Sequence, residues 1–384
     1  MNPIGILTAA DESLHHQITD TFASVGSSDP AWTEKVCAMA MARDGSLQIG
    51  FGLGKYTNRN VMDAYAALSR GKEQLTVRAS RNLANDPEHT VIGPIRYEIV
   101  EPLRKIRFRL EPNPCQPIAF DWLFEAAVPP FLEERTHLRQ QFRVMSELVR
   151  YHQTGTASGW IELDGKRHEM TPETWVSTRD HSWGVRYDVG VPPADVEPRP
   201  TIPPGIGFMM IWCPVLMERP DGSHYALHLH FTRFEATGFQ QKMVTARVEH
   251  PDGSTEVIAD IQPELEFDPR NRRLLGGRLN CTMEDGSARP LRMEVLGDTG
   301  IQLGAGLYFG FDGHHHGEWR GDLHIDGERI LDCSQPDEAR RLHQLRDTTV
   351  RVHDEKGGAI GWGNCQPIAA GPWPELGLDD DGWM

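Results

Sequence analysis

Short turns built on Asp-Gly recur along this chain and constrain its fold more than any other feature. In such a pair the Gly reaches positive φ at no steric cost and the Asp tolerates the same region, which suits a tight hairpin turn. Runs of strand length flank each pair. The pairs are Asp44-Gly45, Asp164-Gly165, Asp221-Gly222, Asp252-Gly253 and Asp285-Gly286. Strands joined by tight turns at regular spacing predict an all-β fold of antiparallel barrels or sandwiches.

The runs between these turns predict strands along most of the chain. Alternation is clearest in residues 105–110, where Ile106, Phe108 and Leu110 fall on one face. The expected strands of the first half are residues 35–43, 47–57, 61–69, 73–81, 90–100, 105–110, 118–126 and 157–163. Those of the second half are residues 207–218, 223–235, 243–249, 255–261, 278–283, 291–296, 350–353 and 360–365. The pattern of residues 134–150 fits either a helix or a strand.

One helix is expected near the C-terminal end of the chain. Residues 332–346 place three apolar side chains on one side of a helix. Pro336 falls in the first turn, and Ser334 or Asp337 is the expected N-cap.

The length of 384 residues predicts two domains of ordinary size. The boundary is expected in a proline-rich linker over residues 191–206. This divides the chain into an N-terminal lipocalin-like β domain at 1–190 and a C-terminal lipocalin-like β domain at 207–372. Residues 373–384 form an acidic tail in this division.

Charge and cysteine spacing narrow the range of partners. A formal net charge of −16 argues against nucleic acid as a partner, because nucleic acid requires a basic surface. The sequence contains no apolar window long enough for a transmembrane helix and no secretory signal at its N-terminus, so no membrane insertion is expected. The six cysteines are scattered and form no Cys-x-x-Cys pair. This spacing predicts reduced thiols in a cytoplasmic protein. The oligomeric state stays open.

Residues 175–186 have the most unusual composition, with two Trp, two Arg, an Asp-His pair and a Gly together. Charged side chains are seldom buried without a partner, and a buried Trp usually needs one for its ring N–H. The stretch therefore indicates a polar cluster set into an apolar wall. Such a cluster is either a ligand site or a structural network that joins the two domains.

A regular strand would divide this stretch into two faces. The faces would carry Trp175, Arg179, His181 and Trp183 on one side and Thr178, Asp180, Ser182 and Arg186 on the other. Asp180 and His181 are the candidate catalytic residues. Only one of them should face a given cavity, unless Gly184 marks a bulge that re-aims the chain.

Two histidine clusters supply further candidates. His224, His228 and His230 share one strand face, which lines a polar cavity, presents metal ligands or is simply half-exposed. The second cluster holds His314, His316 and Trp319, for which a pocket-rim role is expected. Neither cluster has a third metal ligand fixed by sequence spacing, so no metal is expected.

Several common catalytic motifs are absent from the sequence. It contains no nucleophile elbow, P-loop, His-Glu-x-x-His or Gly-x-Gly-x-x-Gly in a βαβ setting. What remains is an acidic β protein whose His, Asp and Trp residues gather in three places. Such a set suits proton transfer to or from an apolar ligand, with aromatic faces that stabilise positive charge.

The central stretch resembles a known family. Trp175, followed by the run Arg179-Asp180-His181-Ser182-Trp183-Gly184, is similar to the Trp…Asp-His/Arg-x-Trp-Gly signature of the AttH-like and carotenoid 1,2-hydratase group. That group includes kievitone-type hydratases and the fungal Diels-Alderases. The resemblance implies two lipocalin-like (calycin) β-barrel domains, apolar isoprenoid or polyketide ligands, and catalysis without an organic cofactor. It supports the fold more strongly than the reaction.

These observations predict a cofactor-independent lyase or isomerase, of the hydratase or dehydratase type. Its expected substrate is a hydrophobic terpenoid-like small molecule in an apolar pocket between or inside the barrels. Asp180 or His181 would supply the proton. The expected substrate-binding residues are Trp175, Arg179, Trp183, His228, His230, His314, His316 and Trp319. A non-catalytic carrier of a lipid or terpenoid is the first alternative, and a metal-dependent enzyme that uses a histidine cluster is the second.

Overall fold

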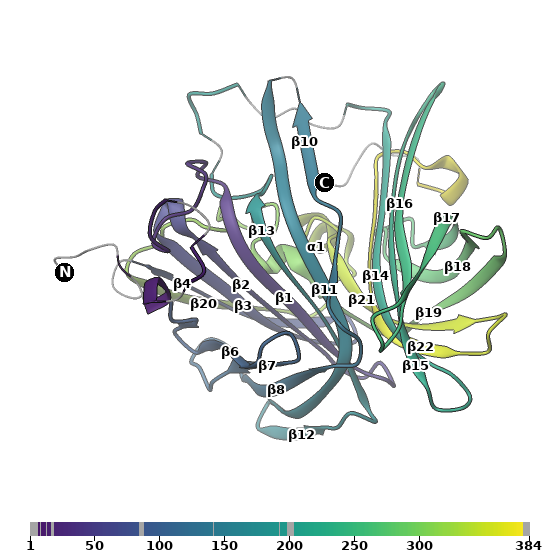
Figure 1. Cartoon of the computed structure of the whole chain (residues 1–384), viewed down its shortest axis with the longest axis horizontal. Coiled ribbons are helices and arrows are strands. Elements are labelled where there is room, and N and C mark those ends of the chain that lie inside the picture. Colours follow the sequence, from purple (N-terminus) through teal and green to yellow (C-terminus); the bar gives the residue numbers. More distant parts are fainter. Residues whose placement is uncertain are drawn as a thin grey trace.

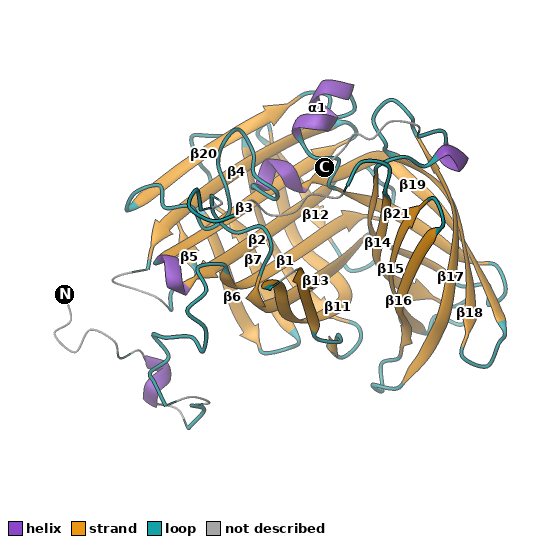
Figure 2. Cartoon of the chain, turned by 90° about the horizontal axis from the view of Figure 1, so that it is seen from above, coloured by secondary structure: helices purple, strands orange, loops and turns teal. Residues whose placement is uncertain are grey.

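A computed structural model describes residues 7, 9–12, 14–16, 19–83, 88–140, 142–191, 193–197 and 203–378 (Figure 1). These residues form two β-sheets that lie side by side, with short helices between strands (Figures 1 and 2). The all-β fold predicted from the hairpin turns is confirmed. No helix of the described residues is long and apolar enough to cross a bilayer.

Sheet A contains fourteen strands, thirteen of them from the first half of the chain. Eleven follow one another in the order β20-β4-β3-β2-β1-β13-β11-β8-β7-β6-β5, and three short strands pair with β11. The strands of the first half are β1 (Trp32–Ala42), β2 (Gln48–Tyr56), β3 (Val61–Arg70), β4 (Glu73–Asn82), β5 (Val91–Ile92), β6 (Ile95–Glu101), β7 (Lys105–Leu110), β8 (Ile118–Ala126), β9 (Phe131–Leu132), β10 (Thr136–Gln140), β11 (Arg143–Leu163), β12 (Lys166–Met170) and β13 (Trp175–Val185). The segment that the pattern left undecided therefore belongs mostly to β10 and β11.

Sheet B is a closed barrel of eight antiparallel strands. Closure removes the exposed edges that an open sheet would leave. Its strands are β14 (Gly207–Glu218), β15 (His224–Ala236), β16 (Phe239–Glu249), β17 (Thr255–Phe267), β18 (Leu274–Met283), β19 (Ala288–Gln302), β21 (Arg346–Asp354) and β22 (Ile360–Ala370). Each sheet encloses its own apolar core, and a third cluster packs between them with Met39, Tyr65, Val176, Leu216 and Ile301 among its members.

One strand of sheet A comes from the second half of the chain. β20 (Leu323–Ile330) pairs antiparallel with β4, with Leu323 opposite Arg81 and Ile330 opposite Gln74. The chain thus returns to the first sheet before β21 and β22 complete the barrel. The proposed domain boundaries remain a prediction. Part of the expected linker (192 and 198–202) and of the acidic tail (379–384) lies outside the described residues.

The C-terminal helix is present but shorter than residues 332–346. The helix α1 covers Pro336–Arg341, with Gln335 as its N-cap in place of Ser334 or Asp337. His343 and Gln344 adopt φ values of 57° and 56°, and left-handed residues cannot continue a right-handed helix. The described residues also form four one-turn 3₁₀ helices, which are η1 (Ala9–Glu12), η2 (Thr57–Arg59), η3 (Leu303–Gly306) and η4 (Pro374–Leu376).

All six cysteines are free thiols. Cys213, Cys281, Cys333 and Cys365 are buried, and Cys37 and Cys115 are half-buried. The structure therefore agrees with individually packed thiols in place of a disulfide framework.

Candidate functional site

A cavity of about 110 Å³ lies where sheet A meets the barrel, and we call it the junction cavity. Strands β1, β11 and β13 form one side of its wall, while β14, β21 and β22 form the other. The charged and aromatic residues that line it include Arg150, Asp180, Arg186, Trp212, Tyr308 and Asp347. Residues from both halves of the chain are therefore required to build it.

A second cavity of about 190 Å³ adjoins the first, and we call it the histidine cavity. Arg150, Trp212 and Gln366 line both cavities. Glu133 and His230 line only the second. The two spaces thus share one wall, so a ligand in one lies close to the residues of the other.

Asp180 presents a carboxyl group to the junction cavity. Burial raises the pKa of this carboxyl, although Arg150 and Arg186 act to lower it. Its side chain makes no hydrogen bond or ion pair with any residue that the structure describes. A carboxyl without a partner in a cavity wall is available to a ligand.

Asp347 is a second carboxyl in the same wall. Burial raises its pKa to about 7, and the negative charge of Asp180 acts in the same direction. Asn364 donates a short hydrogen bond to Asp347 and accepts another from Thr178, which ties the carboxyl to β13. Two neighbouring carboxyls of this kind do not ionise together at the same pH, because like charges repel.

His181 lies on the opposite face of β13 from Asp180, as alternation along a strand requires. Its Nε2 is 2.9 Å from Glu34 Oε1, and the Tyr151 hydroxyl is 3.1 Å from its Nδ1. The pairing of β13 with β1 and β11 runs through this point without a register shift, so no bulge at Gly184 re-aims the chain. Asp180 and His181 therefore do not face one ligand.

The other predicted residues of the central stretch surround His181 or fill the core. Arg179 donates to Gln153 Oε1, and Trp183 packs edge-on against His181 with ring centroids 5.8 Å apart. Trp175 is buried in the apolar core of sheet A. Arg179 is part of the wall of the junction cavity, whereas Trp175 and Trp183 line neither cavity. The substrate-binding role of these three residues remains a prediction.

The histidine run near residue 314 is divided between surface and interior. His314 pairs with Glu318 at 3.1 Å, and Trp319 is 66% exposed. His316 is buried, with Lys35 Nζ 2.9 Å from its Nε2. Burial and the charge of Lys35 lower the pKa of His316 to about 4. These residues do not line either of the two cavities.

His228 and His230 are brought together with an acidic residue of sheet A. Glu133 Oε1 lies 3.6 Å from His228 Nε2. His152 of β11 stacks on His228 with ring centroids 3.6 Å apart, and its two ring nitrogens contact Glu133 at 2.9 Å and Glu249 at 2.6 Å. Hydrogen bonds to these two carboxylates overcome the effect of burial and raise the pKa of His152 to about 9.

Several residues of this site carry no signal in the sequence. Glu133, Arg150 and His152 lie in or beside the segment whose pattern was undecided, and Asp347 is the second residue of β21, a strand that we expected only from residue 350. Trp212 stands in an apolar strand where it resembles a core residue.

The lining of the junction cavity differs from the apolar pocket that we expected. Charged and amide side chains stand beside Met39, Trp212, Leu303 and Tyr308. The reason is the alternation of β13, which turns Thr178 and Asp180 toward the barrel and Trp175 and Trp183 away from it.

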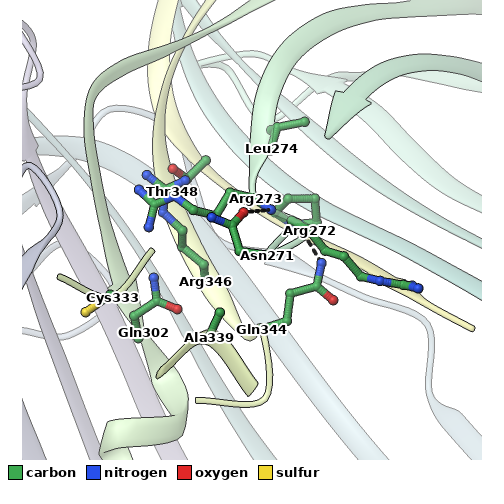
Figure 3. Close-up of a pocket in the computed structure, with 11 residues that line it drawn as sticks. Asn271, Arg272, Arg273, Leu274, Gln302, Cys333, Ala339, Gln344, Arg346 and Thr348 are labelled. Atoms are coloured by element: carbon green, nitrogen blue, oxygen red, sulfur yellow. Dashed lines mark hydrogen bonds between the residues drawn. The ribbon is translucent and has the colours of Figure 1, made fainter. Parts of the chain in front are cut away.

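A third cavity, of about 10 Å³, lies beside α1 and is drawn in Figure 3. Gln344 donates to the backbone oxygen of Arg272, and Asn271 accepts from the backbone of Arg273. Arg346 completes a cluster of buried arginines there. The space suffices for about one water molecule and not for an organic ligand.

Comparison with known proteins places the fold. A family model described as a family of unknown function (DUF8625) matches residues 7–378. No curated protein matches the chain. The crystal structure of a protein named as AttH from Nitrosomonas europaea has a TM-score of 0.50 and 14% identity, and the match covers 88% of this chain and 92% of that one. At this identity the likeness shows the fold alone, and it confirms the AttH-like fold predicted from the central stretch.

Two further solved structures match with lower scores. Kievitone hydratase from Nectria haematococca has a TM-score of 0.42 at 10% identity, covering 88% of this chain and 89% of that chain. The structure of CghA has a TM-score of 0.40 at 12% identity, covering 92% and 90%. Both belong to the group that the central stretch resembles. TM-scores this low give no information about the reaction of this chain.

Proposed function

The chain belongs to the family of unknown function DUF8625, and we propose that it is an enzyme that converts a small molecule by acid–base chemistry in the junction cavity. The observation that carries this proposal is the Asp180 carboxyl. It is held in the wall between the two sheets with a raised pKa and without a hydrogen-bond partner among the described residues. A general acid near neutral pH needs these properties.

The proposed reaction is the addition of water to a carbon–carbon double bond, or its reverse. Protonated Asp180 would transfer its proton to one alkene carbon, and the electron pair of the double bond would form the new C–H bond. Water would then add to the cationic carbon, and the Asp180 carboxylate would take up the proton that this water releases. The carboxyl is thereby restored, and no oxidant or reductant is consumed. The same proton transfers without water would shift the double bond, which is an isomerisation.

Other side chains of the cavity suit this chemistry. Trp212 and Tyr308 offer aromatic faces that stabilise a cationic centre. Asp347, with a pKa of about 7, is a second carboxyl in the same wall that can hold or release a proton near neutral pH. The proposal includes a hydrophobic terpenoid-like substrate. This part rests only on the resemblance of residues 175–186 to the AttH-like and carotenoid 1,2-hydratase group. The two cavities together approach the lower end of the range of about 300–1,000 Å³ that is usual for ligand pockets.

The test compares chemistry with binding. We expect Asp180→Asn to bind a tertiary terpenoid alcohol or its alkene within a few-fold of the wild type, because the amide keeps the shape of the carboxyl. Turnover should fall by about 10²–10⁴-fold, because the amide cannot deliver a proton. Asp260→Asn is the matched control, since Asp260 is a partly exposed carboxylate that pairs with Lys242 on the barrel. It should leave both quantities unchanged.

A separate His181→Gln variant decides between the two faces of β13. A large loss of turnover in this variant, with the turnover of Asp180→Asn unchanged, would show that catalysis takes place on the face of β13 where His181 contacts Tyr151 and Glu34. Tight binding of the alcohol by a wild-type chain that turns over neither compound would favour the non-catalytic carrier. Failure to bind any compound of the series would reject the substrate class.

A further inference from the structure

His228 and His230 of the barrel converge at the edge of the histidine cavity with Glu133, which follows β9 of sheet A. One nitrogen or oxygen atom from each side chain lies within 4.8 Å of the others. The 3.6 Å between Glu133 Oε1 and His228 Nε2 is near the edge of a tetrahedron with bonds of about 2.1 Å, which is roughly 3.4 Å. We propose that Glu133, His228 and His230 form a binding site for a divalent transition-metal ion of the zinc type.

The state of His228 gives independent support for a bound ion. Its side chain is 2% exposed, and neither ring nitrogen has a hydrogen-bond partner among the described residues. A buried polar atom without a partner costs about 1–3 kcal/mol, and a neutral imidazole has an acceptor nitrogen as well as a donor. A metal ion at Nε2 gives the acceptor nitrogen the partner that the surrounding protein does not supply.

Neighbouring side chains hold Glu133 in one orientation. Arg150 donates two hydrogen bonds to Oε2, at 2.8 and 2.6 Å, so Oε1 is the oxygen that faces His228. His152 contacts this Oε1 and is itself anchored by Glu249. Trp212 packs edge-on against His228 with centroids 5.8 Å apart, which restricts the ring. Outer contacts of this kind orient metal ligands in known sites.

Three protein ligands leave a coordination position open. Two histidines and one glutamate are a donor set of catalytic zinc sites, where water or substrate occupies the fourth position. Glu133 and His230 line the histidine cavity, so this position would be open to a small molecule there. The site is independent of the acid–base proposal, because its test measures the metal and not turnover.

The experiment uses the untagged full chain after treatment with EDTA and dialysis. We expect titration with Zn²⁺ to give one bound ion per chain and to raise the Tm, because the ligands meet only in the folded protein. Co²⁺ should give a visible absorption band of a low-coordinate N/O site. His230→Ala should weaken binding at least about 10-fold, since loss of a ligand costs no less than loss of an outer contact. His230 makes no side-chain hydrogen bond within the described chain, so this variant should fold.

The control addresses binding elsewhere on the chain. His315→Ala alters the run of three histidines at 314–316 and should leave the affinity unchanged. Glu133→Gln and His228→Ala should each repeat the loss seen for His230→Ala. The proposal is overturned if equimolar Zn²⁺ does not bind, if His230→Ala binds it as the wild type does, or if His315→Ala abolishes binding. A crystal structure that shows only a water molecule between the three side chains after a Zn²⁺ soak would overturn it too.

Discussion

His152 Nε2 lies 2.6 Å from Glu249 Oε1, and this buried contact joins sheet A to the barrel. His152 comes from β11 and Glu249 is the last residue of β16. The other ring nitrogen of His152 contacts Glu133, so one imidazole links two carboxylates. The two sheets thus meet through a polar network as well as through the apolar cluster around Met39 and Leu216.

The first prediction concerns the stability that this contact provides. His152→Ala should lower the free energy of unfolding by about 3–5 kcal/mol, because it leaves buried carboxylates without their partner. Urea denaturation of His152→Ala, Glu249→Ala and the double variant, all in EDTA, measures the coupling. We expect a coupling of about 0.5–3 kcal/mol. Strict additivity of the two single changes would show that the contact does not hold the sheets together.

The second prediction concerns Asp347 and pH. Burial raises its pKa from 3.8 to about 7 in the folded state, so the folded protein holds a proton that the unfolded chain has already lost. This contribution is complete below about pH 4 and is lost as the pH rises through 7, with a limit of about 4 kcal/mol. Asp347→Asn mimics the protonated carboxyl. It should therefore remove the part of the fall in folding stability with rising pH that is due to Asp347.

Urea denaturation at pH 5 and pH 8 measures the effect of Asp347. The variant should exceed the wild type in stability by a larger margin at pH 8 than at pH 5, because only part of the loss between the unfolded and folded pKa values has taken place at pH 5. Asp260→Asn serves as the control and should not change the pH profile in this direction. Parallel profiles of Asp347→Asn and the wild type would contradict a raised pKa at this carboxyl.

The third prediction concerns the thiols. Mass spectrometry after alkylation in denaturant without reductant should find six modified cysteines, because all six are free. In the folded protein Cys115 should react first, because it is half-buried and the pKa of the equally half-buried Cys37 is raised to about 12 by burial. Cys115→Ser should remove this fast phase. Fewer than six modified residues in denaturant would reveal a disulfide.

The hairpins could be predicted from the sequence because their signal is local. The turn at Asp221-Gly222 predicted a strand over 207–218, and β14 has these bounds. Non-local pairings have no such signal. β20 pairs with β4 across more than two hundred residues of chain, and nothing in the sequence of Leu323–Ile330 distinguishes a barrel strand from an added strand of sheet A.

Only the part of the candidate site that lies on a single strand could be predicted from the sequence. Alternation along residues 175–185 is enough to place Asp180 and His181 on opposite faces. The residues that line the junction cavity with Asp180 could not be found in this way, because Arg150 comes from β11 and Asp347 from β21. Likewise, the strand of His228 and His230 suggested two metal ligands but not Glu133, which lies in the connection between β9 and β10 of the other sheet.

The last prediction concerns Gly184, at the end of the central stretch. Gly184 has a φ of 134°, and a Cβ atom built there would lie 2.0 Å from the backbone oxygen of Glu147 on β11. Both facts exclude a side chain while the strand pairing stays regular. Gly184→Ala should therefore force β13 and β11 apart next to Leu148, which pairs with Gly184 and lines the histidine cavity. Gly165 is the matched control, since it has a φ of 75° in an Asp-Gly turn and nothing within 4 Å of its Cβ position. Gly165→Ala meets only the strain of a left-handed backbone, about 1–2 kcal/mol, whereas Gly184→Ala adds the clash and should cost at least about 2 kcal/mol more. Urea denaturation of the two variants measures this difference. Equal losses would mean that the two strands can separate without cost, and the close approach at Gly184 would then have no part in building the cavity wall.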